Sequence, residues 1–212
     1  MRQVSPFIPH NYKDSSLPCS VFVFEIENIS GEERSVSITF VMKNGTGCKK
    51  DSDRNQKSET FETDAVEGSI IKQCFEGLPC DYLIGVKKTK ETLTSKVIRI
   101  KSNGPGNALW EDLSDNGILT EKSEDKNQRP GKDICIGVSS MIKLMPQQTG
   151  TIETAFVWHS PKVKFPKSQQ EHLKYYTKYF ENGQEIIEYA LEKYPLWEKW
   201  ISEWQKDVLE DV

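Results

Sequence analysis

Residues 19–28, which read CSVFVFEIEN, decide the class of fold. This stretch is apolar on both faces at its start, and it ends with Ile26 between Glu25 and Glu27. Alternation with a period of two indicates a β-strand that is buried at one end and half exposed at the other. Residues 34–42 (RSVSITFVM) alternate in the same way after a short turn that contains glycine. The two stretches therefore predict an antiparallel hairpin.

Further strand-like runs occur at residues 69–75, 81–87, 91–101, 133–144 and 151–159. With the first pair they make about seven strands at hairpin spacing, which predicts a mainly β fold, an antiparallel β-sandwich. Strands do not alternate with helices, so a parallel α/β architecture is not expected. The polar stretches 44–67 and 120–132 are predicted as loops. Residues 107–116 are predicted as a short helix that Gly117 closes.

The composition restricts the functional classes. The 212 residues carry a net charge of -4 with a pI near 5.6. A chain with this charge is not expected to bind nucleic acid. The sequence contains no apolar run of about 18 residues, so no membrane-spanning helix is predicted. The five irregularly spaced cysteines and three scattered histidines form neither a disulfide framework nor a familiar metal site. We expect reduced, mostly buried thiols, a cytosolic compartment and no cofactor.

The C-terminal segment follows a helical pattern instead. Apolar residues recur at i, i+3, i+4 and i+7 on either side of Pro195. Because proline interrupts helices, the pattern predicts two short C-terminal amphipathic helices with a break between them. The second helix carries a tryptophan stripe that either docks onto another domain or forms local core. The candidate domain-docking residues are Trp197, Trp200, Ile201 and Trp204.

Several other residues have a functional and a structural interpretation. Glu25 and Glu27 could form a catalytic carboxylate pair, but an exposed strand face is favoured. Glu111 and Asp112 beside Trp110 could flank a sugar platform, but a helix anchored by one buried tryptophan is favoured. No catalytic role is assigned to the histidines, because none has a serine or cysteine partner in a recognisable motif.

Two features near the end of the last long strand are treated in the same way. Trp158 alternates in register with Phe156 and is predicted to lie in the core. Lys162, Lys164 and Lys167 could favour an anionic membrane surface, although a solvated loop is the preferred interpretation.

Four segments resemble a known family. Residues 8–28 (IPHNYKDSSLPCSVFVFEIEN), 40–47 (FVMKNGTG), 174–183 (KYYTKYFENG) and 197–209 (WEKWISEWQKDVL) resemble, in order, segments of the non-lysosomal glucosylceramidases of glycoside hydrolase family 116. The third is similar to the family's Tyr-Thr-Arg-Phe-Phe-Gly segment, and the fourth to its linker helix. Two departures, Asn11 for a common aspartate and His159 for an acidic or amide residue, concern loop contacts.

The resemblance implies a partial N-terminal β-sandwich at residues 1–180 and, at 181–212, a helical linker toward a catalytic helical domain. In the family that domain supplies the acid/base aspartate and the nucleophilic glutamate that a retaining glycosidase needs. No residue here matches either one, so no catalytic residue is predicted and the chain alone is expected to be inactive.

The implied function is therefore that of a non-catalytic domain of a β-glucosidase that hydrolyses glucosylceramide to glucose and ceramide. Its implied partner is the catalytic domain, through which glucosylceramide is bound. The implied location is the cytosolic side, with peripheral association with endoplasmic reticulum or Golgi membranes. A free-standing β-sandwich module for interaction or carbohydrate binding is the alternative, and it should fold alone with an aromatic platform on its surface.

Overall fold

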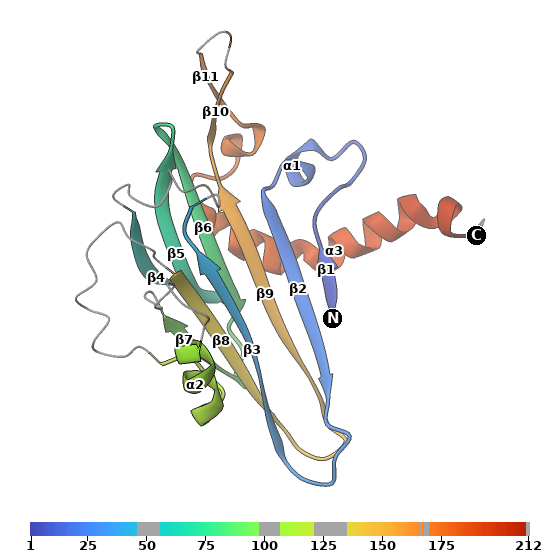
Figure 1. The fold of residues 1–212 in the computed structure, drawn as a ribbon. Helices are drawn as coiled ribbons and strands as arrows, with labels where there is room; N and C mark the ends of the chain where they lie inside the picture. Colours follow the sequence, from blue (N-terminus) through green and yellow to red (C-terminus); the bar gives the residue numbers. More distant parts are fainter. Residues whose placement is uncertain (46–55, 98–106, 121–134, 166, 168–169, 211–212) are drawn as a thin grey trace.

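A computed structural model describes residues 1–45, 56–97, 107–120, 135–165, 167 and 170–210. It has three layers (Figure 1): a small sheet, a large sheet, and helix α3 (Gly183–Glu210) across the outer face of the large sheet. The large sheet has the strand order β1 (Arg2–Val4), β2 (Cys19–Glu27), β9 (Thr149–His159), β6 (Leu78–Lys87), β5 (Val66–Phe75), β4 (Lys57–Glu62). The small sheet has the order β3 (Arg34–Lys43), β8 (Cys135–Leu144), β7 (Thr92–Val97). The antiparallel β-sandwich is confirmed.

Smaller elements complete the fold. A two-stranded ribbon joins β10 (Lys162–Lys164) and β11 (Glu171–Leu173), so Lys162 and Lys164 lie in short strands and not in a loop. Helix α1 (Tyr12–Ser15) precedes β2, and a 3-10 helix, η3 (Tyr175–Lys178), precedes α3. The predicted helix at 107–116 is confirmed as α2 (Asn107–Asn116), and Gly117 closes it with a φ of 79°. No helix in the described ranges has both the length and the apolar character needed to cross a bilayer.

The predicted hairpin of residues 19–28 and 34–42 is wrong. Strand β2 pairs with β1 and β9 in the large sheet, whereas β3 pairs with β8 in the small sheet. The chain crosses from one sheet to the other between them. The reason is that the phenylalanines of the two strands face each other across the sandwich: the rings of Phe22 and Phe24 lie 5.2 and 6.0 Å from that of Phe40. In facing sheets the three rings pack against one another between the layers, where they are half-buried.

The five remaining predicted strands correspond to β5, β6, β7, β8 and β9. Residues 98–101 and 133–134 of the predicted runs lie outside the described residues, as do residues 46–55 and 121–132 of the two predicted loops. The predicted loop 44–67 is partly wrong, because β4 lies within it and pairs with β5. Its sequence, KSETFE, has only Phe61 as a buried apolar residue, so it gives a weak strand signal.

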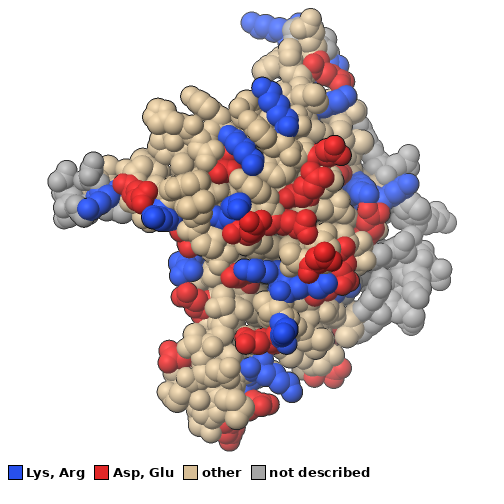
Figure 2. All heavy atoms as spheres, turned by 180° about the vertical axis from the view of Figure 1, so that it is seen from behind, with Lys and Arg blue, Asp and Glu red and all other residues tan. Residues whose placement is uncertain are grey.

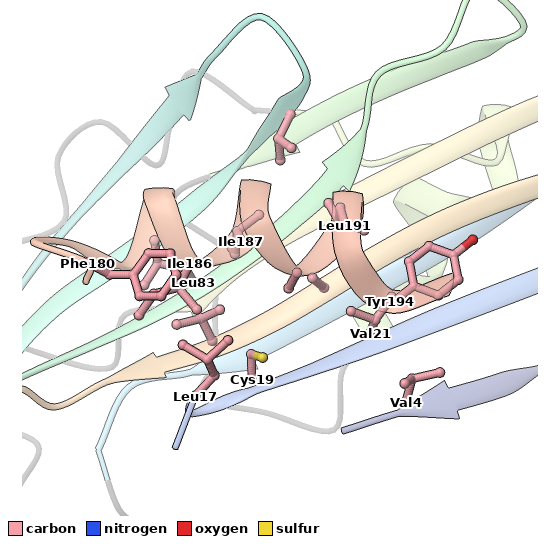
Figure 3. Packing of buried hydrophobic residues seen from close by; sticks show 14 of the residues in the cluster. Val4, Leu17, Cys19, Val21, Leu83, Phe180, Ile186, Ile187, Leu191 and Tyr194 are labelled. Atoms are coloured by element: carbon pink, nitrogen blue, oxygen red, sulfur yellow. The ribbon is translucent and has the colours of Figure 1, made fainter. Parts of the chain in front are cut away.

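Two apolar layers hold the fold together. Between the sheets lie two clusters, one around Ile71, Ile84 and Ile136 and the other around Ile142 and Leu144. The larger cluster lies between the large sheet and α3 (Figure 3). There the residues of β2, β6 and β9 that face α3 contact the buried helix residues Ile186, Ile187, Ala190, Leu191, Tyr194 and Trp197. The first half of α3 is therefore part of the core.

Helix α3 is continuous, so the predicted break at Pro195 is wrong. Pro195 lies inside the helix with an exposed side chain, between the buried Tyr194 and Trp197. Proline removes one backbone hydrogen bond from a helix interior and costs about 3 kcal/mol. Burial of the apolar stripe on both sides of Pro195 offsets this cost, since tertiary packing supplies most of the stability of protein helices.

Two tryptophans lie at the surface, contrary to prediction. Trp110 of α2 is 69% exposed, so it does not anchor that helix in the core. Trp158 is 40% exposed, because the small sheet does not reach the end of β9 where it stands. The described cysteines are free: Cys19 and Cys135 are buried, Cys80 is half-buried and Cys74 is exposed. Burial raises the pKa of the Cys19 thiol to about 12.

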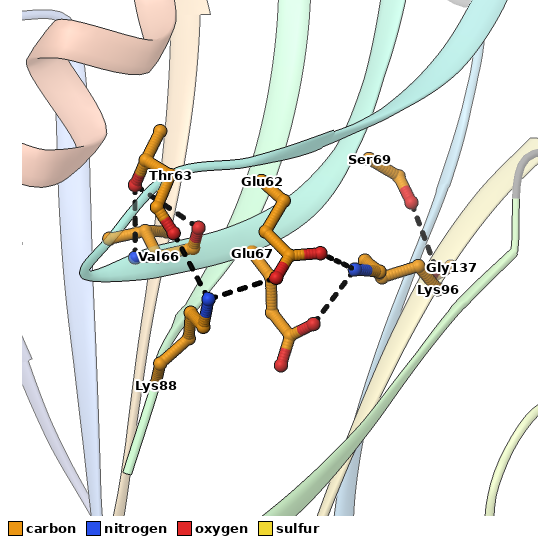
Figure 4. Close-up of polar contacts among 8 residues, drawn as sticks. All are labelled: Glu62, Thr63, Val66, Glu67, Ser69, Lys88, Lys96 and Gly137. Atoms are coloured by element: carbon orange, nitrogen blue, oxygen red, sulfur yellow. Dashed lines mark hydrogen bonds and ion pairs between the residues drawn. The ribbon is translucent and has the colours of Figure 1, made fainter.

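An ion-pair network ties the edges of the two sheets together (Figure 4). The Lys96 ammonium of β7 lies 3.1 Å from Glu62 of β4 and 2.8 Å from Glu67 of β5. Lys88 adds a second contact to Glu62 at 2.9 Å. The hydrogen bonds from the two lysines lower the pKa of Glu62 to about 2. The network therefore fixes the small sheet against the large one at the end opposite β1.

Candidate domain-docking surface

The apolar stripe of α3 continues past the end of the large sheet. Trp197, Ile201, Trp204 and Val208 follow one another at spacings of four, three and four, so they share one face of the helix. Their burial falls steeply along that face. Trp197 is fully buried and Ile201 is partly buried, whereas Trp204 is 40% and Val208 66% exposed.

The end of the sheet explains this gradient. Strand β1 is the edge strand of the large sheet, and α3 continues beyond it and projects from the body of the molecule (Figure 1). The same projection appears when the molecule is viewed from behind (Figure 2). A helix that keeps its apolar face after its support has ended exposes that face to solvent, which is typical of an interaction site.

One aromatic residue from the N-terminal segment partly covers the stripe. The ring of Phe7 lies edge-on to Trp204, with centroids 6.1 Å apart and an interplanar angle of 62°. The indole Nε1 of Trp204 also donates a hydrogen bond to the Phe7 carbonyl at 3.3 Å. Phe7 is itself 69% exposed. The two rings therefore form a solvent-facing pair that extends the helix stripe.

Beside this pair lies a groove of about 580 Å³ between β1 and the second half of α3. Its lining consists of Arg2, Gln3, Val4, Ser5, Glu198, Ile201 and Ser202. Strand β1 pairs with β2 on one side only, so its other edge presents backbone N–H and C=O groups to the groove. We call the groove together with Phe7, Trp204 and Val208 the α3–β1 surface.

Charged groups define the rim of this surface. Arg2 lies between Glu198 of α3 and Glu25 of β2, at 3.0 and 2.9 Å. The two carboxylates raise the pKa of Arg2, and Glu198 has the larger effect. Lysine, arginine and carboxylate side chains are interspersed over the face seen in Figure 2, with neither sign dominating. The surface therefore combines an apolar centre with a mixed polar border, the usual anatomy of a protein interface.

The segment that carries Phe7 is fixed onto the first half of α3. The Lys13 ammonium lies over the rings of Tyr179, Phe180 and Tyr189, at 4.4 Å from the last. The Tyr189 hydroxyl donates a 2.9 Å hydrogen bond to the buried carboxylate of Asp14. The same carboxylate hydrogen-bonds to the Asn11 side chain at 2.7 Å. These contacts hold the start of the chain against the helix, so the α3–β1 surface is built from both ends of the domain.

The structure places the four predicted docking residues in three environments. Trp197 lies inside the core, Trp200 and Ile201 pack against the edge of that core, and Trp204 is the exposed one of the four, at 40%. Their docking role stays a prediction. Sequence reasoning missed Val208, which continues the same spacing, and Phe7, which no local pattern connects to α3.

The carboxylates weighed as a catalytic pair lie on the exposed outer end of β2. Glu25 is ion-paired with Arg2, and Glu27 is exposed as well. Elsewhere in the described ranges, Glu153 accepts a 2.8 Å hydrogen bond from Tyr194 and pairs with Lys87. Among the residues that the structure describes, no group of histidine, cysteine or acidic side chains is arranged to hold a metal ion.

The fold and the α3–β1 surface define a class: a two-sheet β-sandwich domain with a packed helix that leaves part of its apolar face exposed. A family model described as "beta-glucosidase 2, glycosyl-hydrolase family 116 N-term" matches residues 1–197. The chain therefore belongs to this family, as the N-terminal domain of a family 116 β-glucosidase. The match ends at the buried Trp197, so the exposed part of α3 lies beyond it.

Proposed function

We propose that this chain is the non-catalytic domain of a β-glucosidase that hydrolyses glucosylceramide, and that it braces the catalytic domain through the α3–β1 surface. The observation that supports the proposal is the gradient of burial along one face of α3, from 0% at Trp197 to 66% at Val208. A tryptophan beside a second aromatic ring is the type of anchor that dominates interface energies.

The proposal includes the inactivity of the isolated chain. A retaining glycosidase needs two carboxyl groups about 5–5.5 Å apart, one of them with a raised pKa to act as the acid. The only carboxyl group described here with a resolved upward pKa shift is Asp81, which desolvation raises. Asp81 does not line either of the two grooves described for the chain. We therefore assign the hydrolysis of glucosylceramide to the catalytic domain.

The docking proposal can be tested by binding. The 212-residue chain is titrated by calorimetry with a separately produced catalytic domain of a family 116 β-glucosidase. Trp204→Ala is expected to weaken binding by about tenfold or more, because interface tryptophans are frequent hot spots. Trp110→Ala is the matched control, since Trp110 is 69% exposed on α2 and outside the surface. It should leave the affinity unchanged.

The alternative, a free-standing module, leads to the opposite result. Such a chain would be a stable monomer with no measurable affinity for the catalytic domain, and neither tryptophan substitution would then matter. Equal losses from Trp204→Ala and Trp110→Ala would also contradict docking at the α3–β1 surface.

We further propose peripheral association with endoplasmic reticulum or Golgi membranes from the cytosolic side. The resemblance to the glucosylceramidases and the lysines of the β10–β11 ribbon support this. Lys162 and Lys164 lie on that ribbon, and Lys162 is ion-paired with Glu171 at 2.9 Å. Flotation with vesicles that contain anionic lipid tests the proposal, and Lys164→Glu should reduce the bound fraction. Equal flotation of the variant would contradict a role for the ribbon.

A further inference from the structure

A second groove lies at one end of the sandwich. Figure 1 shows the elements at this end, where β3 stops and β9 leads into β10. Its volume is about 510 Å³, a size that suits one small molecule. Its lining consists of Met42, Lys43, Phe75, Cys80, Tyr82, Phe156, Trp158, Ser160 and Lys174. We call it the aromatic groove. It is separate from the α3–β1 surface and shares no residue with it.

The unequal lengths of the two sheets create this groove. The pairing of β3 with β8 ends at Lys43 and Cys135, whereas β6 and β9 continue to the pair Asp81 and His159. The small sheet therefore covers the side chains of β6 and β9 that point toward it only up to this level. Near the end of β9, side chains that point in the same direction have no opposing strand of the small sheet. Phe156 lies at the border of this region, and Trp158 lies beyond it with 40% of its surface exposed.

Three of these residues form a continuous aromatic row. The ring of Phe156 lies 6.1 Å from that of Tyr82 and 5.4 Å from that of Trp158. Phe75 and Met42 add apolar surface to the lining. Trp158 is exposed and the other two rings are half-buried. The row offers its contact area at a small cost in side-chain entropy, because its rings are already held against one another.

The charged groups of the lining have one sign. Among the described residues of the lining, the charged ones are Lys43 and Lys174, and none is an aspartate or a glutamate. Lys174 is half-buried, and it has no ion-pair partner among the described residues. Burial and the Asp81 carboxylate raise the pKa of Cys80 to about 11, and the charge of Lys174 opposes them. Burial lowers the pKa of His159, and the charge of Lys174 adds to this effect. The groove therefore presents positive charge beside an apolar floor.

We propose that the aromatic groove binds a small anionic amphiphile. The anionic group lies against Lys174, and the apolar body packs on Tyr82, Phe156 and Trp158. Carboxylates and phosphates form charge-assisted hydrogen bonds with lysine, which are about twice as strong as neutral ones. The burial of an alkyl chain against these rings adds a favourable hydrophobic contribution.

The polar groups of the groove favour this ligand over a neutral sugar. Sugar hydroxyls need acceptors as well as donors, and carboxylate or amide side chains normally supply the acceptors. The described residues of the lining include no aspartate, glutamate, asparagine or glutamine. Its lysines donate only, so the side chains of the groove offer a sugar stacked on Trp158 few acceptors beyond the hydroxyls of Tyr82 and Ser160.

Calorimetric titration of the 212-residue chain alone tests the proposal. The probes are decanoate, decyl β-glucoside and decyltrimethylammonium, each below its critical micelle concentration. Decanoate is expected to bind one molecule per chain, and the other two more weakly by about tenfold or more. The emission of Trp158 should change in step with the heat.

Two matched pairs of variants locate the site. Lys174→Met is expected to weaken decanoate binding by about tenfold, whereas Lys178→Met should not, because the Lys178 ammonium lies over the Tyr175 ring and outside the groove. Trp158→Ala should weaken binding, whereas Trp110→Ala should not. Far-ultraviolet circular dichroism confirms that each variant is folded.

Three results would overturn the proposal. The first is binding of decyl β-glucoside as tight as that of decanoate, which would indicate a sugar platform. The second is equal binding of the cationic and anionic probes, which would indicate a purely apolar site. The third is decanoate binding that Lys174→Met leaves unchanged. Because the catalytic domain is absent from this titration, its result does not depend on docking at the α3–β1 surface.

Discussion

The two halves of helix α3 have the same kind of sequence and opposite environments. In residues 183–197 the apolar stripe is buried against the large sheet, and Ile186, Ile187 and Trp197 have no exposed surface. In residues 198–210 the stripe continues with Ile201, Trp204 and Val208, but its exposure rises to 66%. The helix has not changed its periodicity, so the difference comes from the sheet, which ends at β1.

This comparison shows what an amphipathic pattern does and does not establish. The pattern identifies which face of a helix is apolar, and it leaves open what covers that face. Where the sheet is present, the stripe is core, and where the sheet ends, the same stripe becomes a surface. The substitutions below should therefore have large effects on stability in the first half of α3 and small effects in the second.

The largest effect is expected for Trp197→Ala. The removal of a fully buried indole leaves a cavity in the main core and should lower the free energy of unfolding by about 3–5 kcal/mol. Urea denaturation followed by circular dichroism measures the change. A loss below about 1 kcal/mol would mean that Trp197 is not part of the core of the isolated domain.

The next effect is expected for Tyr189→Phe. The substitution removes the hydrogen bond from the tyrosine hydroxyl to Asp14, whose side chain is buried. A buried carboxylate that loses one donor should cost about 1–3 kcal/mol of stability in the same assay. Tyr179→Phe is the control, because Tyr179 is 47% exposed and its hydroxyl contacts only that of Tyr175 at the surface. Equal losses in the two variants would contradict a specific lock between α1 and α3.

The stability of the layer between the large sheet and the first half of α3 should also depend on pH. His159 packs edge-on against Tyr176 close to the start of α3, and burial lowers its pKa from the usual 6.5. A group with a depressed pKa in the folded state contributes its full stability above the unfolded pKa, and that contribution decreases as the pH falls below about 6.5. His159→Asn should flatten this part of the stability profile. An unchanged slope in the variant would assign the effect to other groups.

The smallest effect on stability is expected for Trp204→Ala. The indole is 40% exposed and contacts mainly Phe7, so its loss should cost less than about 1 kcal/mol in the urea assay. The contrast with Trp197→Ala sharpens the comparison, since the two residues lie on one face of one helix. A loss as large as that of Trp197→Ala would mean that the second half of α3 belongs to the core.

The sequence predicted most of the helices and strands correctly, but it did not predict which strands pair with one another. A period of two identified β2 and β3 as strands and gave the face on which Phe22 and Phe40 point. It could not distinguish a neighbour in one sheet from a neighbour across the sandwich, because both arrangements bury that face. Pairing of β2 with the distant β9 depends on the whole fold.

The candidate site was predictable only in part, for a similar reason. Trp204 follows from helical spacing, but its exposure depends on where the large sheet ends. Phe7 lies 197 residues away from Trp204 in sequence, and only the folded chain brings the two together. The exposure of Trp158 and Trp110 was not predicted. Alternation or helical spacing indicates which side of an element a residue lies on, whereas its burial depends on how far the opposing layer extends.

Hydrogen–deuterium exchange along α3 tests the central claim most directly, with the chain alone and with an excess of a family 116 catalytic domain. In the chain alone, residues 183–197 should exchange slowly and residues 198–208 quickly, because only the first half is supported by the sheet. When the catalytic domain is added, exchange should slow at 198–208 and at 2–7, and it should not change in α2. Uniform protection of the whole helix in the isolated chain, or slowing on binding confined to other surfaces, would contradict the account.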